Sequence, residues 1–522
     1  MEMLQTQTVT IIALVIFAAA MIAIGLYSWR KAQTIDGFLL GGRNIGAWVS
    51  AFAYGTSYFS AVVFVGYAGQ HGWNIGLGGM WIGIGNALLG CLLAWQLLAK
   101  RTKVMTTTLN TKTMPEFFES RYGSKAIKIF AAIIIFVFLV PYSAAVYKGL
   151  SSMFSAIFPG VPDNVWLLLI AVLTAFYLVL GGYAATAYTD FVQGIIMIVG
   201  VFAMIIAIVN TDAVGGFGNV ISNLAAIPDN GDGVTGAQLT SWYGGSSLKF
   251  LCVNILLTSF GTWGLPQMVS KYYAIKDVKA VKQAKVISTV FSLIIGCGAY
   301  FVGSLSRLVL GNKLPEGGVD AVIPQTLLTA LGDANIVTTI ILAIILILLL
   351  SASMSTLSSI VLSSASAVSV DLIPEVKKNF KPKNQMLVTR ILCFVFVGLS
   401  YVFATSNITI IVNIMSFSWG IVSGCFIGPY VWGIYSKKIT KAGAWAGMLA
   451  GFMTVLVTTI VLTVMNSDAA ESVYAAFKMA ASKAPEMGCA AMAVSVIVTP
   501  VVSLFTPKFS KEHLDKVFAN KE

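Results

Sequence analysis

A single segment shows most directly what kind of protein this chain forms. It starts as the unbroken apolar stretch Ile340-Ile-Leu-Ala-Ile-Ile-Leu-Ile-Leu-Leu-Leu350 and turns abruptly into Ser351-Ala-Ser-Met-Ser-Thr-Leu-Ser-Ser359. Positions 352, 355, 356 and 359 follow the i, i+3, i+4, i+7 pattern, so they share one face of a helix. Ser355, Thr356 and Ser359 therefore put three hydroxyl groups on that face, and Ser358 lies at its flank.

Hydroxyl groups in such a row have two interpretations. Neutral oxygens can replace water around a hard monovalent cation, above all when carbonyls of an unwound helix join them. Alternatively, Ser and Thr are favoured where helices pack closely, and they often bond their own i−4 carbonyl. Two interrupted helices elsewhere in the chain, described below, favour cation binding.

The whole chain has the composition of a membrane protein. Of its 522 residues, 57% are hydrophobic and only 10% are charged. An average soluble protein has about 25% charged residues, so soluble enzymes, nucleic-acid binders and disordered chains are excluded. We expect an all-α polytopic membrane protein whose helices each cross a hydrocarbon layer of about 30 Å.

Hydropathy predicts thirteen transmembrane helices. Because no linker separates them, residues 1–507 are expected to form one transporter domain, followed by a cytoplasmic tail at 508–522. The predicted apolar runs are 8–28, 45–67, 76–99, 127–157, 164–183, 190–210, 248–270, 284–306, 335–369, 388–406, 408–435, 442–465 and 487–506.

The basic residues predict the orientation in the membrane. Acidic Glu2 precedes the first run and Trp29-Arg30-Lys31 follows it, so we expect a retained helix with its N-terminus outside. Alternate segments on the other side, including one from Lys271 to Lys285, then hold 27 of the 33 Lys and Arg residues. This bias predicts a multi-pass protein of the plasma membrane with a cytoplasmic C-terminus, and it explains the net charge of +12 without a nucleic-acid partner.

Two of the predicted helices are interrupted at matching positions. The second reads Ser50-Ala-Phe-Ala-Tyr-Gly-Thr-Ser-Tyr-Phe-Ser-Ala61, and the seventh reads Ser259-Phe-Gly-Thr-Trp-Gly-Leu-Pro-Gln267. An offset of five helices reverses the orientation, so helices 2–6 (residues 45–210) and 7–11 (residues 248–435) would form an inverted repeat around a binding site. The alternative is that both interruptions are packing kinks.

Two charged residues lie in or beside predicted membrane helices. Asp190, at the inner end of the sixth run, is either a functional carboxylate or a cap of the first helical turn. Lys148 lies well inside the fourth run, where it either extends toward the outer surface or faces a cavity and pairs with a substrate carboxylate.

An enzyme is not expected, because the parts of an active site are missing. The two histidines, His71 and His513, have no Cys or carboxylate at ligand spacing. A channel is less favoured, because no filter repeat is present. No obligatory protein partner is evident; the expected partners are the lipid bilayer, a small solute and a cation.

Several motifs resemble those of the sodium:solute symporter family, which includes proline, pantothenate, sialic acid, sugar, iodide and monocarboxylate carriers. The resemblance covers about residues 8–507. It rests on Met354-Ser-Thr-Leu-Ser358, Tyr188-Thr-Asp-Phe-Val-Gln-Gly194, Gly264-Leu-Pro-Gln267, and Gly433-Ile434 with Lys438, Gly443-Ala444, Gly447 and Gly451. It implies the leucine-transporter-type inverted repeat of five plus five helices, with one extra helix before it and two after.

The resemblance also implies where one or two sodium ions bind. The main site would use carbonyls of Thr56, Phe59 and Ala352 with the hydroxyls of Ser355 and Thr356. In some branches of the family a second sodium lies between residues that match Asp190, Ser355, Ser358 and Ser359, and this chain has all four.

The resemblance says least about the identity of the transported solute. The proline branch has an Asp at the position of Tyr58 and aromatic residues at Thr258 and Thr262, whereas the sialic acid branch has a cation near Lys148. We expect a sodium-coupled importer of a small carboxylate-bearing solute, an amino acid, sialic acid or monocarboxylate, that works by alternating access. A proton-coupled or sodium-independent carrier is the alternative. The predicted solute-binding residues are Ser57, Tyr58, Ser60, Lys148, Thr258, Thr262 and Gln267.

Overall fold

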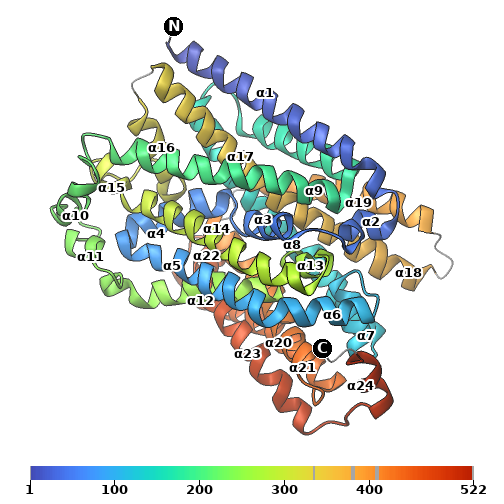
Figure 1. Ribbon diagram of the computed structural model, residues 1–522. Helices are drawn as coiled ribbons and strands as arrows, with labels where there is room; N and C mark the ends of the chain where they lie inside the picture. The colour runs from blue at the N-terminus through green and yellow to red at the C-terminus, as the bar shows by residue number, and fades with distance from the viewer. Residues whose placement is uncertain (1, 333–334, 378–381, 406–410, 520–522) are drawn as a thin grey trace.

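The protein is a bundle of helices (Figure 1). The computed structural model describes residues 2–332, 335–377, 382–405 and 411–519, and within them the strand pairing consists of one isolated bridge between Ile45 and Ile275. Three parts of the prediction lie outside these ranges: the end of the 388–406 run, the start of the 408–435 run, and the last three residues of the 508–522 tail. An all-helical membrane protein is therefore confirmed.

The long helices form most of the bundle, and shorter ones lie between them or connect them. The long helices are α1 (Glu2–Ser28), α8 (Lys125–Ile157), α9 (Asp163–Val209), α12 (Leu248–Gly264), α14 (Val278–Ser304), α17 (Ile336–Ser366), α19 (Pro382–Ala404), α20 (Ile411–Tyr435), α21 (Lys441–Met465) and α23 (Ala484–Leu504). The shorter ones are α2 (Ile35–Leu40), α3 (Ala47–Tyr58), α4 (Ala68–Ile75), α5 (Met80–Gly85), α6 (Lys100–Thr108), α7 (Met114–Tyr122), α10 (Val220–Ala225), α11 (Gly236–Thr240), α13 (Pro266–Ala274), α15 (Ser306–Val309), α16 (Val322–Ala330), α18 (Ile373–Val376), α22 (Val473–Ala481) and α24 (Lys511–Val517). Segments of π-helix lie at Val62–Tyr67, Asn86–Leu93, Trp95–Ala99 and Ala367–Leu372.

Within the described residues, ten helices are long and apolar enough to cross a membrane, or eleven if the bent pair α12 and α13 counts as one. This is fewer than the thirteen predicted runs, although each run coincides with helix. The 45–67 run is split between α3 and the next helix, and helix then continues from Val62 to Thr108 through the 76–99 run. The 164–183 and 190–210 runs both lie in α9.

Helix α9 contains a kink at Gly182, where two helical segments meet. This residue has φ +53° and ψ −149°, a conformation that suits glycine. A Cβ atom here would lie 2.5 Å from the Phe38 carbonyl oxygen, so there is also no room for a side chain. The kink separates two predicted membrane segments that no polar stretch divides.

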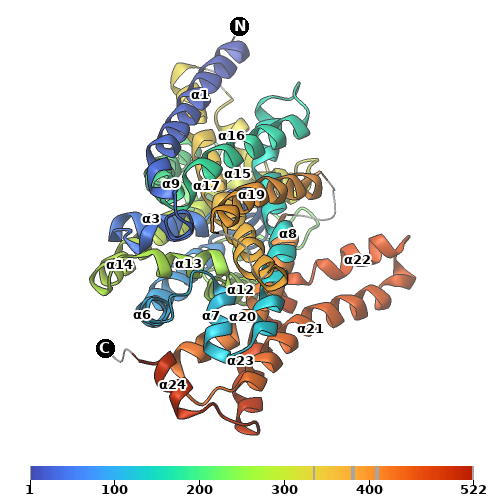
Figure 2. The same ribbon diagram turned by 90° about the vertical axis from the view of Figure 1, so that its right-hand side faces the viewer.

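The first broken helix lies in the interior of the bundle. Helix α3 packs against α9, α14 and α17, and α20 packs against α8, α12, α21 and α23. Helices α21 and α22 lie at the periphery (Figure 2). Close helix contacts depend on small residues: a Cβ atom on Gly303 would lie 2.0 Å from the carbonyl oxygen of Ala68.

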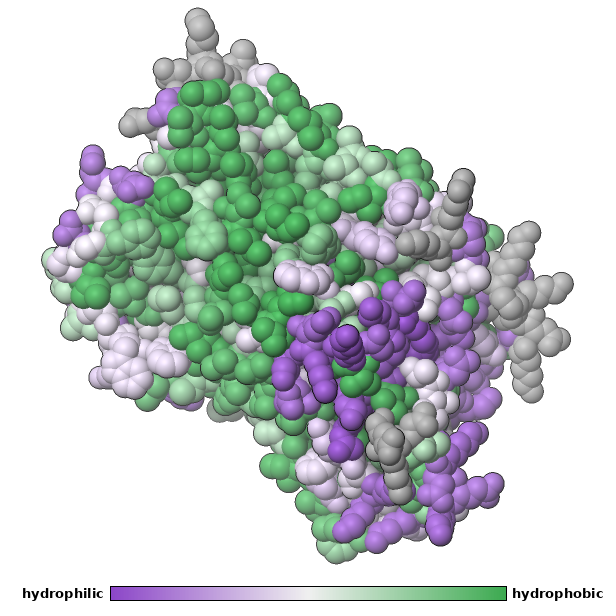
Figure 3. All heavy atoms as spheres, in the orientation of Figure 1, coloured by the Kyte–Doolittle hydropathy of each residue, from purple (hydrophilic) through white to green (hydrophobic). Residues whose placement is uncertain are grey.

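The surface separates an apolar middle from polar ends. Figure 3 shows hydrophobic residues over most of this face, and hydrophilic ones gathered at the end where Figure 1 places α6, α7, α18 and α24. The loop that carries α10 and α11 lies at the opposite end. This distribution is that of a protein whose middle faces lipid.

The segment predicted as a tail contains helix α24, which docks on the polar end of the bundle. Val517 is buried, and the Nε2 atom of His513 lies 3.0 Å from the carbonyl oxygen of Arg121. The guanidinium of Arg121 lies 5.7 Å from the ring centroid of Phe509 and 5.2 Å from that of Phe518. The described part of 508–522 is therefore packed against α7.

Candidate functional site

The first interruption is a true break in the helix. Helix α3 ends at Tyr58, Phe59 is extended with φ −106° and ψ 102°, and helix resumes at Val62. The carbonyls of the last turn before such a break lack the N–H partners that a continuing helix would supply. Residues 50–61 are all buried, so these carbonyls lie inside the protein.

Helix α17 brings two hydroxyl groups to these carbonyls. Ser355 Oγ lies 3.0 Å from the carbonyl oxygen of Thr56 and 3.1 Å from that of Ala352. Thr356 Oγ1 lies 3.3 Å from the carbonyl oxygens of both Thr56 and Ser57, and 3.1 Å from that of Ala352. The structure thus gathers four of the five residues predicted for the main sodium site, and the fifth, Phe59, is the extended residue at the break.

The spacing of these oxygens suits a small hard cation. Ligands at about 2.4 Å from a six-coordinate ion lie about 3.4 Å from one another, close to the separations at this site. In this structure the hydroxyls of Ser355 and Thr356 donate hydrogen bonds to carbonyl oxygens. Beside a cation they would rotate and direct their lone pairs toward the ion. The donor set, neutral hydroxyl and carbonyl oxygen, fits sodium.

Asp190 lies inside helix α9 and is fully buried. It follows the Gly182 kink by two turns, so it does not cap the helix, which was one of its two interpretations. Its neighbour Thr189 bonds back to the carbonyls of Ala185 and Thr186. Asp190 is therefore a buried carboxylate of the bundle interior.

The partner of Asp190 is a residue that the sequence analysis placed in a cytoplasmic segment. Lys271 lies on α13 and is 1% exposed, and its Nζ atom is 3.8 Å from Oδ2 of Asp190. The sequence analysis assigned Lys271 to a cytoplasmic segment because the predicted helix ended at residue 270, whereas the structure buries its side chain inside the bundle. Its apolar neighbours were the signal that could have extended the helix by one more turn.

The remaining residues of the predicted second sodium site differ in their contacts. Ser359 Oγ lies 2.9 Å from Ser57 Oγ and accepts a hydrogen bond of 2.8 Å from Lys271. Ser358 instead donates to the carbonyl of Ser355, in its own helix, at 3.0 Å. Asp190 and Ser359 are thus brought together through the ammonium of Lys271.

The second interruption joins α12 to α13. Leu265 is extended, with φ −81° and ψ 123°, and Pro266 starts the new helix at a bend of 50°. Gln267 follows directly, and both polar atoms of its buried amide make no hydrogen bond with any described residue. Such an unsatisfied buried amide is costly and calls for a partner.

Five of the predicted solute-binding residues use their hydroxyl groups within the protein, and the contact of Ser57 with Ser359 is described above. The Tyr58 hydroxyl donates to the carbonyl of Thr258 at 2.7 Å, which ties the two broken helices together. Thr258 Oγ1 donates to Asn86 Oδ1 at 2.7 Å, and Thr262 Oγ1 donates to the carbonyl of Gly90 at 3.2 Å. Ser60 Oγ accepts from the N–H of Val62 at 3.2 Å, at the start of the resumed helix.

Lys148 lies on α8 and is half-buried. Its charge interacts with that of Asp320, whose carboxylate accepts a hydrogen bond from the N–H of Ile411 at 3.2 Å. The next residue, Gly149, packs at the first break, because a Cβ atom there would lie 3.2 Å from the carbonyl carbon of Ala61. Lys148 is thus close to the break after α3, and the acidic group that influences its charge, Asp320, lies in the segment before α16.

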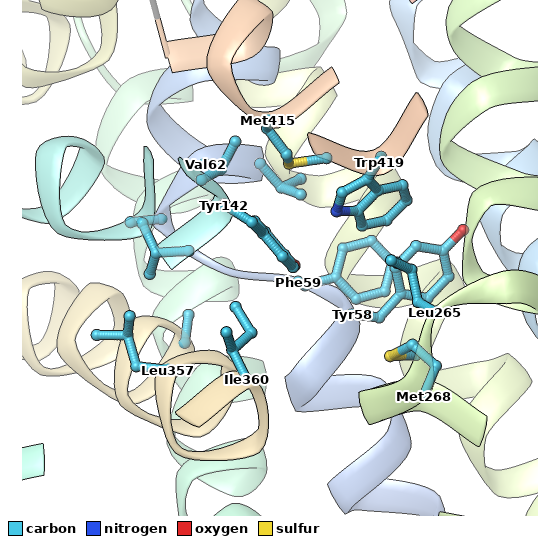
Figure 4. Close-up of a cluster of buried hydrophobic side chains, with 14 of the residues drawn as sticks. Tyr58, Phe59, Val62, Tyr142, Leu265, Met268, Leu357, Ile360, Met415 and Trp419 are labelled. Carbon is cyan, nitrogen blue, oxygen red and sulfur yellow. The ribbon is translucent and has the colours of Figure 1, made fainter. Parts of the chain in front are cut away.

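Aromatic and aliphatic side chains cluster between the two breaks (Figure 4). Tyr142 of α8 meets Trp419 of α20 edge to face at 5.7 Å, and Tyr58 stacks on Phe59 at 4.8 Å between ring centroids. Leu265 from the second break joins the same cluster. The sequence analysis did not select Tyr142 and Trp419, because an aromatic residue in an apolar run is common in membrane helices and does not by itself indicate a site.

A helical bundle with two broken helices that meet at a buried site is the architecture of secondary transporters. The comparison with protein families agrees with this class. The profile of the sodium:solute symporter family matches residues 38–451, and the chain belongs to that family. The resemblance is confirmed, and the protein is a sodium-coupled solute symporter and not an enzyme.

Individual relatives have low sequence identity to this chain, but the similarity extends over most of their length. The chain is 27% identical to the high-affinity proline transporter PutP of Bacillus subtilis (strain 168), over 82% of this chain and 88% of that one. It is 27% identical to a sodium/proline symporter of Staphylococcus aureus (strain JH9), over 84% of both chains. The fold matches that of a sodium-coupled sialic acid symporter with a TM-score of 0.73 at 17% identity, over 96% of this chain and 99% of that one.

Proposed function

We propose that this protein imports a small carboxylate-bearing organic solute together with sodium across the plasma membrane. The observation that carries the proposal is the oxygen cluster of Thr56, Ser355 and Thr356, which lies where one broken helix meets α17. Sodium bound there would hold α3 against α17. Because those helices also border the space between the two breaks, ion binding would shape the solute site.

The proposed transporter has thirteen transmembrane helices, with the N-terminus outside and the C-terminus in the cytoplasm. The segments 45–210 and 248–435 would be its inverted repeats within a single domain of residues 1–507, and 508–522 its cytoplasmic tail. In favour of the larger number, α9 is kinked at Gly182, and the helical segment from Val62 to Thr108 turns at Gly76, which has φ +67° and ψ −138°. Splitting the helices at these points gives runs that match the hydropathy.

The solute would lie between the two breaks, beside Gln267. The unsatisfied amide of this residue can donate a hydrogen bond to a carboxylate oxygen, and the Tyr142 and Trp419 rings can cover a compact apolar body. These groups favour an amino acid or a monocarboxylate over a polyhydroxylated acid such as sialic acid. The names of the relatives, proline transporters, agree with a compact amino acid.

The other predicted solute contacts have subordinate roles in this proposal. Ser57, Tyr58, Ser60, Thr258 and Thr262 would shape the wall, because their hydroxyls already have protein partners. Lys148 would attract the carboxylate on its way in, from the side of Asp320. Alternating access then follows when bound sodium and solute together stabilise closure of the outer side and opening of the inner side.

Sodium supplies the driving force in this scheme. Each ion that enters down a membrane potential of about 100 mV contributes about 2.3 kcal/mol before any concentration gradient is added. The alternative is a proton-coupled or sodium-independent carrier of the same fold.

Uptake into proteoliposomes tests the proposal. Proline, other amino acids, sialic acid and monocarboxylates are offered with an imposed sodium gradient, an imposed proton gradient or neither. We expect sodium-driven uptake of one of the compact carboxylates, and we expect Gln267→Met to reduce it while the surface variant Gln96→Met leaves it unchanged. Uptake that follows the proton gradient and ignores sodium would overturn the proposal in favour of the alternative.

A further inference from the structure

Lys271 places its amino group in the interior of the bundle. Its Nζ atom donates a hydrogen bond of 2.8 Å to Ser359 Oγ, lies 3.8 Å from Asp190 Oδ2 and lies 5.0 Å from the ring centroid of Tyr183. A buried ammonium is costly unless a carboxylate and hydrogen-bond acceptors surround it. Lys271 has both kinds of partner and a ring face, so its position is well defined.

These partners coincide with the residues expected to hold a second sodium ion. Asp190 would supply the charge of that site and Ser359 one of its hydroxyls, and both face the ammonium. An ammonium and a sodium ion carry the same unit charge and bind the same oxygens. Two such cations beside one buried carboxylate would repel each other strongly, because the interior screens charge poorly. The residues present therefore do not fit a second sodium while Lys271 is in place.

The ammonium is also connected to the main cation site. Ser359 Oγ lies 2.9 Å from Ser57 Oγ, and the carbonyl of Ser57 lies 3.3 Å from Thr356 Oγ1. Lys271 is on α13, Ser359 on α17 and Ser57 on α3. This chain of contacts therefore joins both broken helices to α17. A fixed cation at this place can hold the three helices together as a bound ion would.

We propose that the ammonium of Lys271 is the resident cation of the second site, so that this transporter binds one sodium ion and not two. The inference rests on the proposed function, because it assumes that the Thr56, Ser355 and Thr356 site binds sodium. It differs from that proposal in fixing the number of ions.

A cavity beside Lys271 makes the proposal testable by substitution. It has a volume of about 30 Å³, room for about two water molecules, and it is bordered by Lys271, Ser359, Thr113 and Ser366. Thr113 begins α7, at the polar end of the bundle. Truncation of Lys271 would enlarge this space and leave Asp190 as a carboxylate that a sodium ion can reach.

The test is the saturation binding of radioactive sodium to the purified full-length protein. We expect one ion per molecule for the wild type and for Lys276→Ala, which removes an exposed lysine from the same region. We expect two ions for Lys271→Ala, and one again when Asp190→Asn is added to it. Lys271→Arg, which keeps a cation, should bind one.

The outcomes separate the two proposals. Two sodium ions bound to the wild type would overturn the inference and leave sodium coupling intact, whether or not the variants fold. One ion bound to a folded Lys271→Ala protein would also overturn it. No sodium bound to the wild type would refute the sodium coupling on which the inference rests.

Discussion

Thr356→Val is the most direct perturbation of the proposed sodium site. The substitution keeps the volume and the branched shape of the side chain and removes only the hydroxyl, whose oxygen lies 3.1 to 3.3 Å from the carbonyl oxygens of Ala352, Thr56 and Ser57. A hydrogen-bonding or ligand contact to a charged partner contributes about 1.5–3 kcal/mol. Loss of this one ligand should therefore raise the sodium dissociation constant about 10- to 150-fold.

The assay is equilibrium binding of radioactive sodium, with the sodium dependence of uptake as a second readout. Thr459→Val is the matched control, because Thr459 is buried in α21 and its hydroxyl donates to the carbonyl of Val455 in its own helix and to the sulfur of Met487, away from the proposed sodium site. Thr356→Ser should recover most of the affinity, because it restores the oxygen. If Thr356→Val binds sodium as tightly as the wild type, the hydroxyl is not a ligand and the site is wrongly placed.

Three further predictions concern the stability of the fold. Gly303→Ala should destabilise the protein by about 1–3 kcal/mol or more, because its Cβ would meet backbone, whereas Gly398→Ala, with nothing within 4 Å, should be neutral in thermal unfolding. Partial burial alone would raise the pKa of Asp232, but the hydrogen bond from Arg307 at 2.6 Å holds that pKa below its usual range. Its contribution to the loop between α10 and α11 is therefore present above about pH 4 and lost as the pH falls further. The protection of this loop against hydrogen exchange, corrected for the intrinsic pH dependence of amide exchange, should therefore fall at low pH in the wild type but not in Asp232→Asn. Phe518→Ala removes a ring from the Arg121 guanidinium, and faster hydrogen exchange confined to α24 should follow; unchanged exchange would show that other contacts hold this helix.

The sequence predicted the parts of the site that depend on local pattern. The hydroxyl face of Ser355, Thr356 and Ser359 follows from helical periodicity, and the structure places all three at the break in the second predicted helix. The breaks themselves were visible as Gly, Pro and Ser within apolar runs. In each case a few consecutive residues contain the whole signal.

The sequence did not reveal what depends on packing between distant segments. Lys271 and Asp190 are 81 positions apart, and the predicted helix boundary at residue 270 gave no indication that the lysine is buried beside the carboxylate. The kink of α9 at Gly182 depends in the same way on the approach of Phe38. Hydropathy averages over many residues, so it locates membrane helices well and their ends poorly.

The buried basic residues of this chain show how structural and functional charges can be told apart. Arg121 donates to the carbonyls of Gly433 and Ser436, and Arg307 donates to the carbonyl of Trp73 and to Asp232; each fastens helices at one end of the bundle. A guanidinium suits that role, because its planar donors fix several acceptors at once. Lys271 has instead a compact charge and partners that are themselves predicted cation ligands, and it lies on the second half of a broken helix. Loss of either arginine should therefore weaken folding, whereas loss of Lys271 should change what the protein binds, because it vacates a site with a carboxylate already in place.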